Sequence, residues 1–162
     1  MTMHEYLAKV PITRDQIQRK VLDFMHGRND CALVGAWAVN LYVPLEDERL
    51  TADIDLVATN QGVLAELIWA HLVSNFSADF KLMPYADMVR IFFSLKPVVD
   101  VVQVPTLPEV NRIEAIPVVT LEELIAMKRK AIADRGHTPK GLTDQADLMR
   151  LEMVQEQRRK HA

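Results

Sequence analysis

The sequence predicts an α/β domain of the α+β type, in which a mixed β-sheet is flanked by helices and followed by C-terminal helices. Three observations support this prediction. Helix and strand patterns alternate between about residues 14 and 74, three short runs with strand patterning follow at about residues 79–104, and helical periodicity returns in the last quarter of the chain. We place the core of the domain at about residues 31–104 and the C-terminal helices at about residues 120–157.

The first quarter of the chain alternates between the two kinds of element. Apolar residues recur at helical spacing over Arg14–Met25, and this helix ends at the turn-like residues 26–30. The short apolar run Cys31–Val34 is typical of a buried strand. Gly35 then separates this strand from a helix at residues 36–42.

The middle of the chain predicts one more strand and helix before a hairpin-rich half of the sheet. Residues 50–57 form the strand, and Asn60 can cap a helix that runs from Gln61 to about Ser74. Three further runs then show strand patterning. They are residues 80–83, 89–93 and 98–104.

The last part of the chain predicts an edge strand and two helices. Residues 116–119 are a candidate edge strand, and residues 120–123 fit a capping box for a helix that ends near Asp134. A final helix covers about residues 143–157. Basic residues 158–160 follow it and complement the dipole of that helix.

The composition excludes several classes of protein. The chain is 49% hydrophobic and 25% charged, and its formal charge of −3, from 19 Lys+Arg and 22 Asp+Glu, lacks the positive field of a non-specific nucleic-acid binder. Its one cysteine, Cys31, cannot form an internal disulfide. No apolar run approaches the roughly 20 residues that cross a bilayer, and residues 1–14 lack the features of a signal peptide. We therefore expect one cytoplasmic domain over residues 1–162, without a membrane partner.

Two carboxylates lie on the predicted strand at residues 50–57. Because residues i and i+2 of a strand point to the same face, Asp53 and Asp55 project together, opposite to an apolar side. Two carboxylates with Cα atoms about 6–7 Å apart repel each other unless a cation lies between them. Carboxylate oxygens suit Mg²⁺, which often shares its coordination with substrate phosphates.

A third carboxylate, Asp100, interrupts a run of valines, where a lone charge is costly unless it is paired or coordinated. If its strand neighbours that of Asp53, three acids converge and can hold two Mg²⁺ about 3.5–4 Å apart, as phosphoryl or nucleotidyl transfer requires. For Asp53 and Asp55 alone, a solvated turn or a helix cap is the more common explanation. Turn chemistry does not explain Asp100.

Three other positions can contact a phosphate. The junction at Gly35 offers free backbone N–H groups and the positive end of a helix dipole, although tight packing is the more common reason for such a glycine. Lys128 lies on an apolar helical stripe, and Asp144 and Asp147 share a similar stripe on the last helix. Lys128 either reaches a triphosphate or forms an interhelical ion pair with Asp147. Arg49 either neutralises phosphate charge or tethers its loop to the acidic cluster.

Together these segments resemble the signature of the DNA-polymerase-β-like nucleotidyltransferase superfamily: a Gly-Gly/Ser turn between strand and helix, an Arg-x-Thr-x-Asp-x-Asp strand, and a later single Asp. The matching segments are Leu33-Val-Gly35-Ala36-Trp37-Ala38, Arg49-Leu-Thr51-Ala-Asp53-Ile-Asp55-Leu and Val99-Asp100-Val. The chain is similar in particular to the small bacterial group of AbiEii-type toxin nucleotidyltransferases, minimal nucleotidyltransferases and aminoglycoside adenylyltransferases. This resemblance spans about residues 31–151.

The resemblance implies a nucleotidyltransferase fold and specific roles for these residues. Gly35 and Ala36 would cradle the triphosphate of an NTP, with ATP favoured. Asp53, Asp55 and Asp100 would form the metal site, and Asp100 would also activate the acceptor hydroxyl. Ala36 replaces the usual Gly or Ser, so no side-chain hydroxyl is available there, and an acidic loop at residues 46–48 would repel a triphosphate if it folded over the site.

We therefore expect a Mg²⁺-dependent enzyme that transfers a nucleoside monophosphate from an NTP to a hydroxyl, with pyrophosphate leaving. The acceptor is a small molecule, a protein or an RNA, and a partner protein can supply part of its surface. A non-catalytic antitoxin or pseudo-enzyme with the same fold is the main alternative, motivated by Ala36 and the acidic loop. A metal-dependent phosphohydrolase that uses the same acids is a weaker one.

Overall fold

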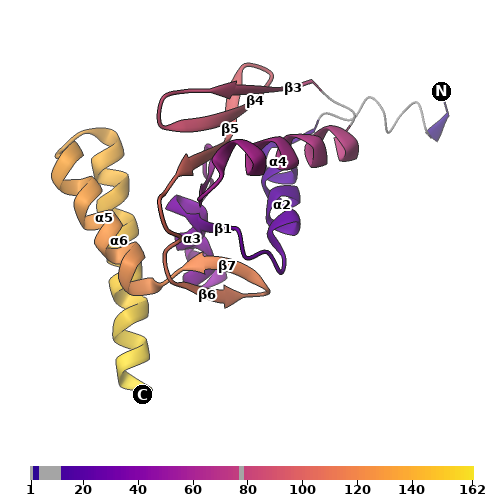
Figure 1. Ribbon diagram of the computed structural model, residues 1–162. Coiled ribbons are helices and arrows are strands. Elements are labelled where there is room, and N and C mark those ends of the chain that lie inside the picture. Colours follow the sequence, from indigo (N-terminus) through magenta and orange to yellow (C-terminus); the bar gives the residue numbers. More distant parts are fainter. Residues whose placement is uncertain (1, 4–11, 77–78) are drawn as a thin grey trace.

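The computed structural model describes residues 2–3, 12–76 and 79–162, and it confirms the predicted α+β class (Figure 1). In chain order the elements are α2 (Arg14–Met25), β1 (Cys31–Val34), α3 (Gly35–Tyr42), the 3₁₀ turn η1 (Leu45–Asp47), β2 (Ile54–Ala58), α4 (Gln61–Phe76), β3 (Phe80–Pro84), β4 (Met88–Phe93), β5 (Lys96–Gln103), β6 (Val110–Ile113), β7 (Ile116–Val119), α5 (Leu121–Arg135) and α6 (Pro139–Lys160).

The strands form one mixed seven-stranded sheet in the order β3-β4-β5-β2-β1-β7-β6. The pairs β2·β5 and β1·β7 are parallel, and the other neighbours are antiparallel. Strands β3, β4 and β5 form the predicted hairpin-rich half. The prediction of an edge strand at residues 116–119 is wrong, because β7 is fully buried between β1 and β6, and the unpredicted strand β6 takes the edge.

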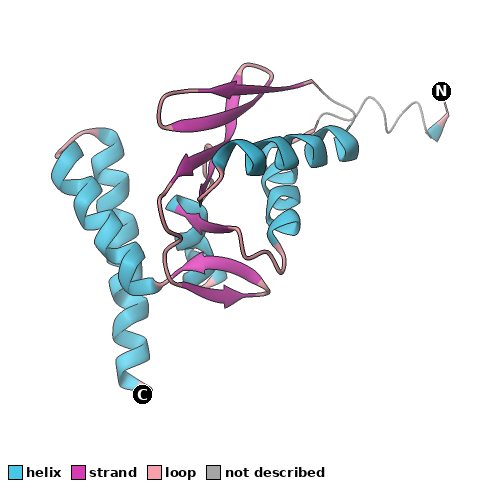
Figure 2. Ribbon diagram, in the orientation of Figure 1, coloured by secondary structure: helices cyan, strands magenta, loops and turns pink. Residues whose placement is uncertain are grey.

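Helices cover the sheet in two groups (Figure 2). Helices α2 and α4 contact each other and β5, while α3 contacts β1, β2 and the pair formed by α5 and α6. Helices α5 and α6 stand to one side of the sheet, and α6 extends beyond the rest of the chain toward the C-terminus (Figure 1). On β2 and β5, alternate residues are fully buried in the core; these are Ile54, Leu56, Val99 and Val101. The other face of these two strands carries the charged residues.

Two predicted boundaries shift. Strand β2 begins at Ile54 rather than at residue 50, because the backbone carbonyl of Thr51 accepts a hydrogen bond from the Gln18 side chain and residues 50–53 make no strand pairing. Helix α6 begins at Pro139 rather than near residue 143, since the Thr138 hydroxyl caps it and proline suits the first helical position. Among the residues described, no helix is both long and apolar enough to span a membrane.

Candidate active site

Three aspartates meet on the charged face of the sheet. Asp55 on β2 lies directly opposite Asp100 on the parallel neighbour β5, and Asp53 immediately precedes β2. One carboxylate oxygen from each residue lies within 4.8 Å of those of the other two. The sequence left open whether the two strands are neighbours, and the structure shows that they are. Three converging carboxylates with oxygen ligands fit a hard divalent cation such as Mg²⁺.

Two aspartates of this triad, Asp53 and Asp55, have raised pKa values, and burial is the largest cause of each shift. Burial raises the pKa of Asp55 to about 7, and the charges of Asp53 and Asp100 add to this effect. The pKa of Asp53 is also raised, first by burial and then by its hydrogen bond with Asp100. Both shifts mean that the folded chain favours the neutral form of these two carboxylates.

The start of α3 lies directly against the triad. Gly35 has φ +71°, and a Cβ atom built on it would lie 2.5 Å from Oδ2 of Asp55. Only a glycine fits here, because any side chain would meet the carboxylate and strain the backbone. Val34, the N-cap residue of α3, supplies no side-chain cap, so backbone N–H groups at this end stay available for an anion. Gly35, at the start of α3, therefore lies beside the three aspartates.

Arg90, which the sequence left without a role, is the direct cationic partner of the triad. On β4 it lies opposite Asp100, and its Nε and Nη2 atoms donate to Oδ1 and Oδ2 of Asp100 at 2.7 and 3.1 Å. Alternation along β4 indicates that Arg90 points away from the buried Val89 and Ile91. The sequence could not show which strand it faces, because that depends on the register between β4 and β5.

A second cluster of charges joins α5, α6 and the segment before β2. Lys128 is 8% exposed, and its Nζ lies 3.2 Å from Asp144 and 3.0 Å from Asp147. Arg49 donates to both oxygens of Asp147, at 2.9 and 2.8 Å. Arg135 and Arg150 complete the cluster, at 2.9 Å from Asp144 and 3.4 Å from Asp147. Of the two alternatives for Lys128, the structure shows the interhelical ion pair, and Arg49 bonds this cluster rather than the triad.

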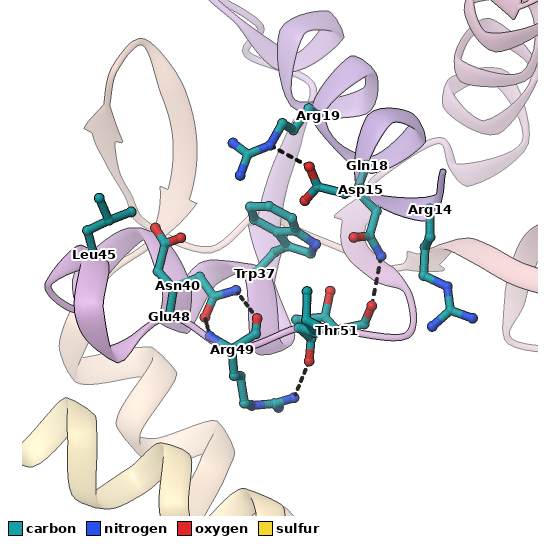
Figure 3. Close-up of a pocket in the computed structure, with 11 residues that line it drawn as sticks. Arg14, Asp15, Gln18, Arg19, Trp37, Asn40, Leu45, Glu48, Arg49 and Thr51 are labelled. Carbon is teal, nitrogen blue, oxygen red and sulfur yellow. Dashed lines mark hydrogen bonds and ion pairs between the residues drawn. The ribbon is translucent and has the colours of Figure 1, made fainter. Parts of the chain in front are cut away.

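The segment that leads into Asp53 is held at several points, some of which Figure 3 shows. The Asn40 side chain donates to the carbonyl of Arg49 at 2.8 Å and accepts from its N–H at 3.1 Å, while Gln18 donates to the carbonyl of Thr51 at 3.2 Å. These side chains and Trp37 line a cavity of about 480 Å³, which the acidic residue Glu48 also lines. Side chains of helices α2 and α3 thus fix the backbone just before Asp53.

Comparison with known proteins adds evidence on the fold. No protein-family model and no curated relative matches the sequence. Among solved structures, the chain is similar to the Megavirus polyadenylate synthase (TM-score 0.64, 14% identity, 91% of this chain and 36% of that one). It is also similar to JHP933 from Helicobacter pylori (TM-score 0.60, 18% identity, 83% of this chain and 62% of that one). A third similar structure is an antigenic nucleotidyltransferase-like protein from Paracoccidioides brasiliensis (TM-score 0.55, 19% identity, 88% of this chain and 78% of that one).

The chain thus spans 36% of the viral synthase and 62% of the Helicobacter protein, so these similarities concern their shared fold. The likeness covers 83–91% of the present chain. The chain has a nucleotidyltransferase fold.

Proposed function

We propose that the protein is a Mg²⁺-dependent nucleotidyltransferase, formed as one domain over residues 1–162, which transfers a nucleoside monophosphate from an NTP to a hydroxyl. The observation that supports this most is the position of three carboxylates beside the open N-terminus of α3. A metal site next to a set of free N–H groups offers both parts that a nucleoside triphosphate needs: cations for its phosphate oxygens and donors for their remaining lone pairs.

In this proposal each residue has a defined task. Asp53, Asp55 and Asp100 would hold two Mg²⁺, which neutralise charge on the attacking and leaving oxygens. The N–H groups of Gly35 and Ala36 would bind the triphosphate. The acceptor oxygen attacks the α-phosphorus, the bond to the bridging oxygen breaks, and pyrophosphate leaves. Asp100, when ionised, takes the proton of the acceptor hydroxyl.

We also propose Arg49 and Lys128 as nucleotide-binding residues that act through charge. Their cluster holds four cations, Lys128 and three arginines, against the two carboxylates Asp144 and Asp147. This surplus lies close enough for the charge of Lys128 to lower the pKa of Asp55. A positive field next to the triad favours a bound triphosphate. ATP is the expected donor, and the resemblance to AbiEii-type and aminoglycoside-modifying enzymes suggests a protein, RNA or small-molecule acceptor.

Thermal unfolding with each of the four NTPs, with and without Mg²⁺, tests this proposal without knowledge of the acceptor. Ligand at a hundredfold its Kd adds about 2.7 kcal/mol of stability, or roughly 5–10 °C in Tm at this size. We expect such a shift with one NTP and Mg²⁺, and its loss in Asp53→Asn. Asp30→Asn, which alters a half-exposed surface ion pair, is the matched control and should keep the shift.

The same proteins then test catalysis. Wild type should move a label from the α-phosphate of the stabilising NTP to an acceptor, and Asp53→Asn should reduce this rate by about 10³-fold. A wild-type protein that no NTP stabilises under any metal condition would overturn the proposal in favour of a non-catalytic module. Release of free nucleotide without a labelled acceptor would indicate a phosphohydrolase.

A further inference from the structure

Arg90 forms part of a row of charges across three neighbouring strands. Asp100 on β5 lies between Arg90 on β4 and Asp55 on β2, as the two registers show. Directly opposite residues on neighbouring strands have Cβ atoms about 4.5–5.5 Å apart. Asp100 therefore has a cation on one side and a second carboxylate on the other.

The contact between Arg90 and Asp100 uses the whole carboxylate. The guanidinium donates to both oxygens in a fork geometry, which is the strongest form of this ion pair. The side chain of Asp100 is only 9% exposed, whereas that of Arg90 is 28% exposed. Within the described parts of the chain, Arg90 is the cation that hydrogen-bonds to the triad, and Lys140 influences Asp53 and Asp55 through charge alone.

A metal ion in the triad needs an oxygen of the same carboxylate. It would also place positive charge on the side of Asp100 opposite to Arg90, within range of strong repulsion between cations. We propose that Arg90 is the counter-ion of Asp100 in the metal-free protein, and that Arg90 and the divalent cation bind Asp100 antagonistically. This inference rests on the proposed metal site.

The surroundings of Arg90 allow its guanidinium to loosen without unfolding of β4. Its guanidinium carbon lies 5.9 Å from the Tyr85 ring and 6.0 Å from the Phe92 ring, so both aromatic faces are within cation–π range. Tyr85 is 46% exposed. A partly exposed arginine within range of two such rings can give up one or both bonds to Asp100 while its charge stays favourably placed.

Titration of metal-free protein with Mn²⁺, followed by calorimetry or by the EPR signal of free Mn²⁺, tests the antagonism. Arg90→Gln should bind Mn²⁺ roughly tenfold more tightly than wild type and should unfold at a lower temperature without metal. Arg90→Lys keeps the charge but cannot form the fork, so its affinity should lie between the two. The matched control is Arg28→Gln, because Arg28 has the same 28% exposure and forms a similar fork with Asp30.

A second measurement is made on the wild-type protein, and variants are needed only to assign its NMR signals. In wild type, the Nε–H NMR signal of Arg90 should move when Mg²⁺ is added, as its bond to Asp100 weakens, while that of Arg28 should not. Suppose that wild type binds Mn²⁺ and that a folded Arg90→Gln variant binds it with equal or lower affinity. This result would overturn the antagonism and leave the metal site in place. Absence of binding in both proteins would remove the metal site and this inference with it.

Discussion

Two groups of aspartates in this molecule are oppositely compensated. Asp144 and Asp147 are both buried, whereas in the triad only Asp100 is buried and Asp53 and Asp55 are partly exposed. Asp144 and Asp147 lie among four cations, and the hydrogen bond from Arg49 and the charge of Lys128 outweigh burial, so that the pKa of Asp147 is lowered. Among the residues that the structure describes, Asp53, Asp55 and Asp100 have one cation in direct contact, Arg90, and the pKa of Asp55 is raised to about 7. The first group stabilises the fold by itself, whereas the second lacks positive charge that a ligand can supply.

The largest expected effect comes from the compensated group. Asp147 is fully buried, so Asp147→Asn leaves Arg49 and Lys128 without their shared counter-charge and frees α6 from the segment before β2. We expect a loss of about 3–5 kcal/mol in the free energy of unfolding, measured by urea denaturation. Glu156→Gln is the control, because its ion pair with Arg159 is exposed and should contribute little. A loss no larger than in this control would show that the cluster is not structural.

The pH dependence of stability should separate the two groups next. Asp55 has its pKa raised from 3.8 to about 7, so the folded metal-free protein holds a proton there that the unfolded chain releases. The contribution of Asp55 to the free energy of unfolding is complete below about pH 4 and is lost as the pH rises through 7. We expect stability to fall by roughly 2–3 kcal/mol between about pH 5 and pH 8.

Asp147 behaves in the opposite way and outside this window. Its lowered pKa stabilises the fold above about pH 4, and that contribution is lost only as the pH falls through the lower, folded-state value. Denaturation of metal-free wild type across the pH range measures how the free energy of unfolding changes with pH. Asp55→Asn should make this dependence flatter. A profile in wild type that is flat or rises from pH 5 to 8 would contradict the account of the triad.

The sequence predicts the triad well because its signals are local. The spacing of Asp53 and Asp55 places both on one face of an extended segment, and a charge among valines marks Asp100 as unusual. The helix stripe that holds Lys128 likewise predicts a buried lysine, and the structure provides its acidic partners. Each of these signals lies within one element, whereas the meeting of the three aspartates depends on the pairing of β2 with β5, which the sequence left open.

What the sequence could not predict depends on pairing between elements. The role of Arg90 requires the register between β4 and β5, and the bond from Arg49 to Asp147 joins residues far apart in the chain. Strand β6 was missed because it has four residues, none of them fully buried, and so shows little apolar pattern. With β6 unseen, β7 was assigned to the edge of the sheet.

The central claim is that the triad lacks a cation and that a metal ion supplies it. The most direct test measures the unfolding of wild type and Asp55→Asn at about pH 8, with EDTA and with saturating Mg²⁺. Without metal, Asp55→Asn should be more stable than wild type by roughly 1–2 kcal/mol, since a buried charge is removed. Mg²⁺ should stabilise wild type and not the variant. A less stable Asp55→Asn together with a wild type indifferent to Mg²⁺ would contradict the account.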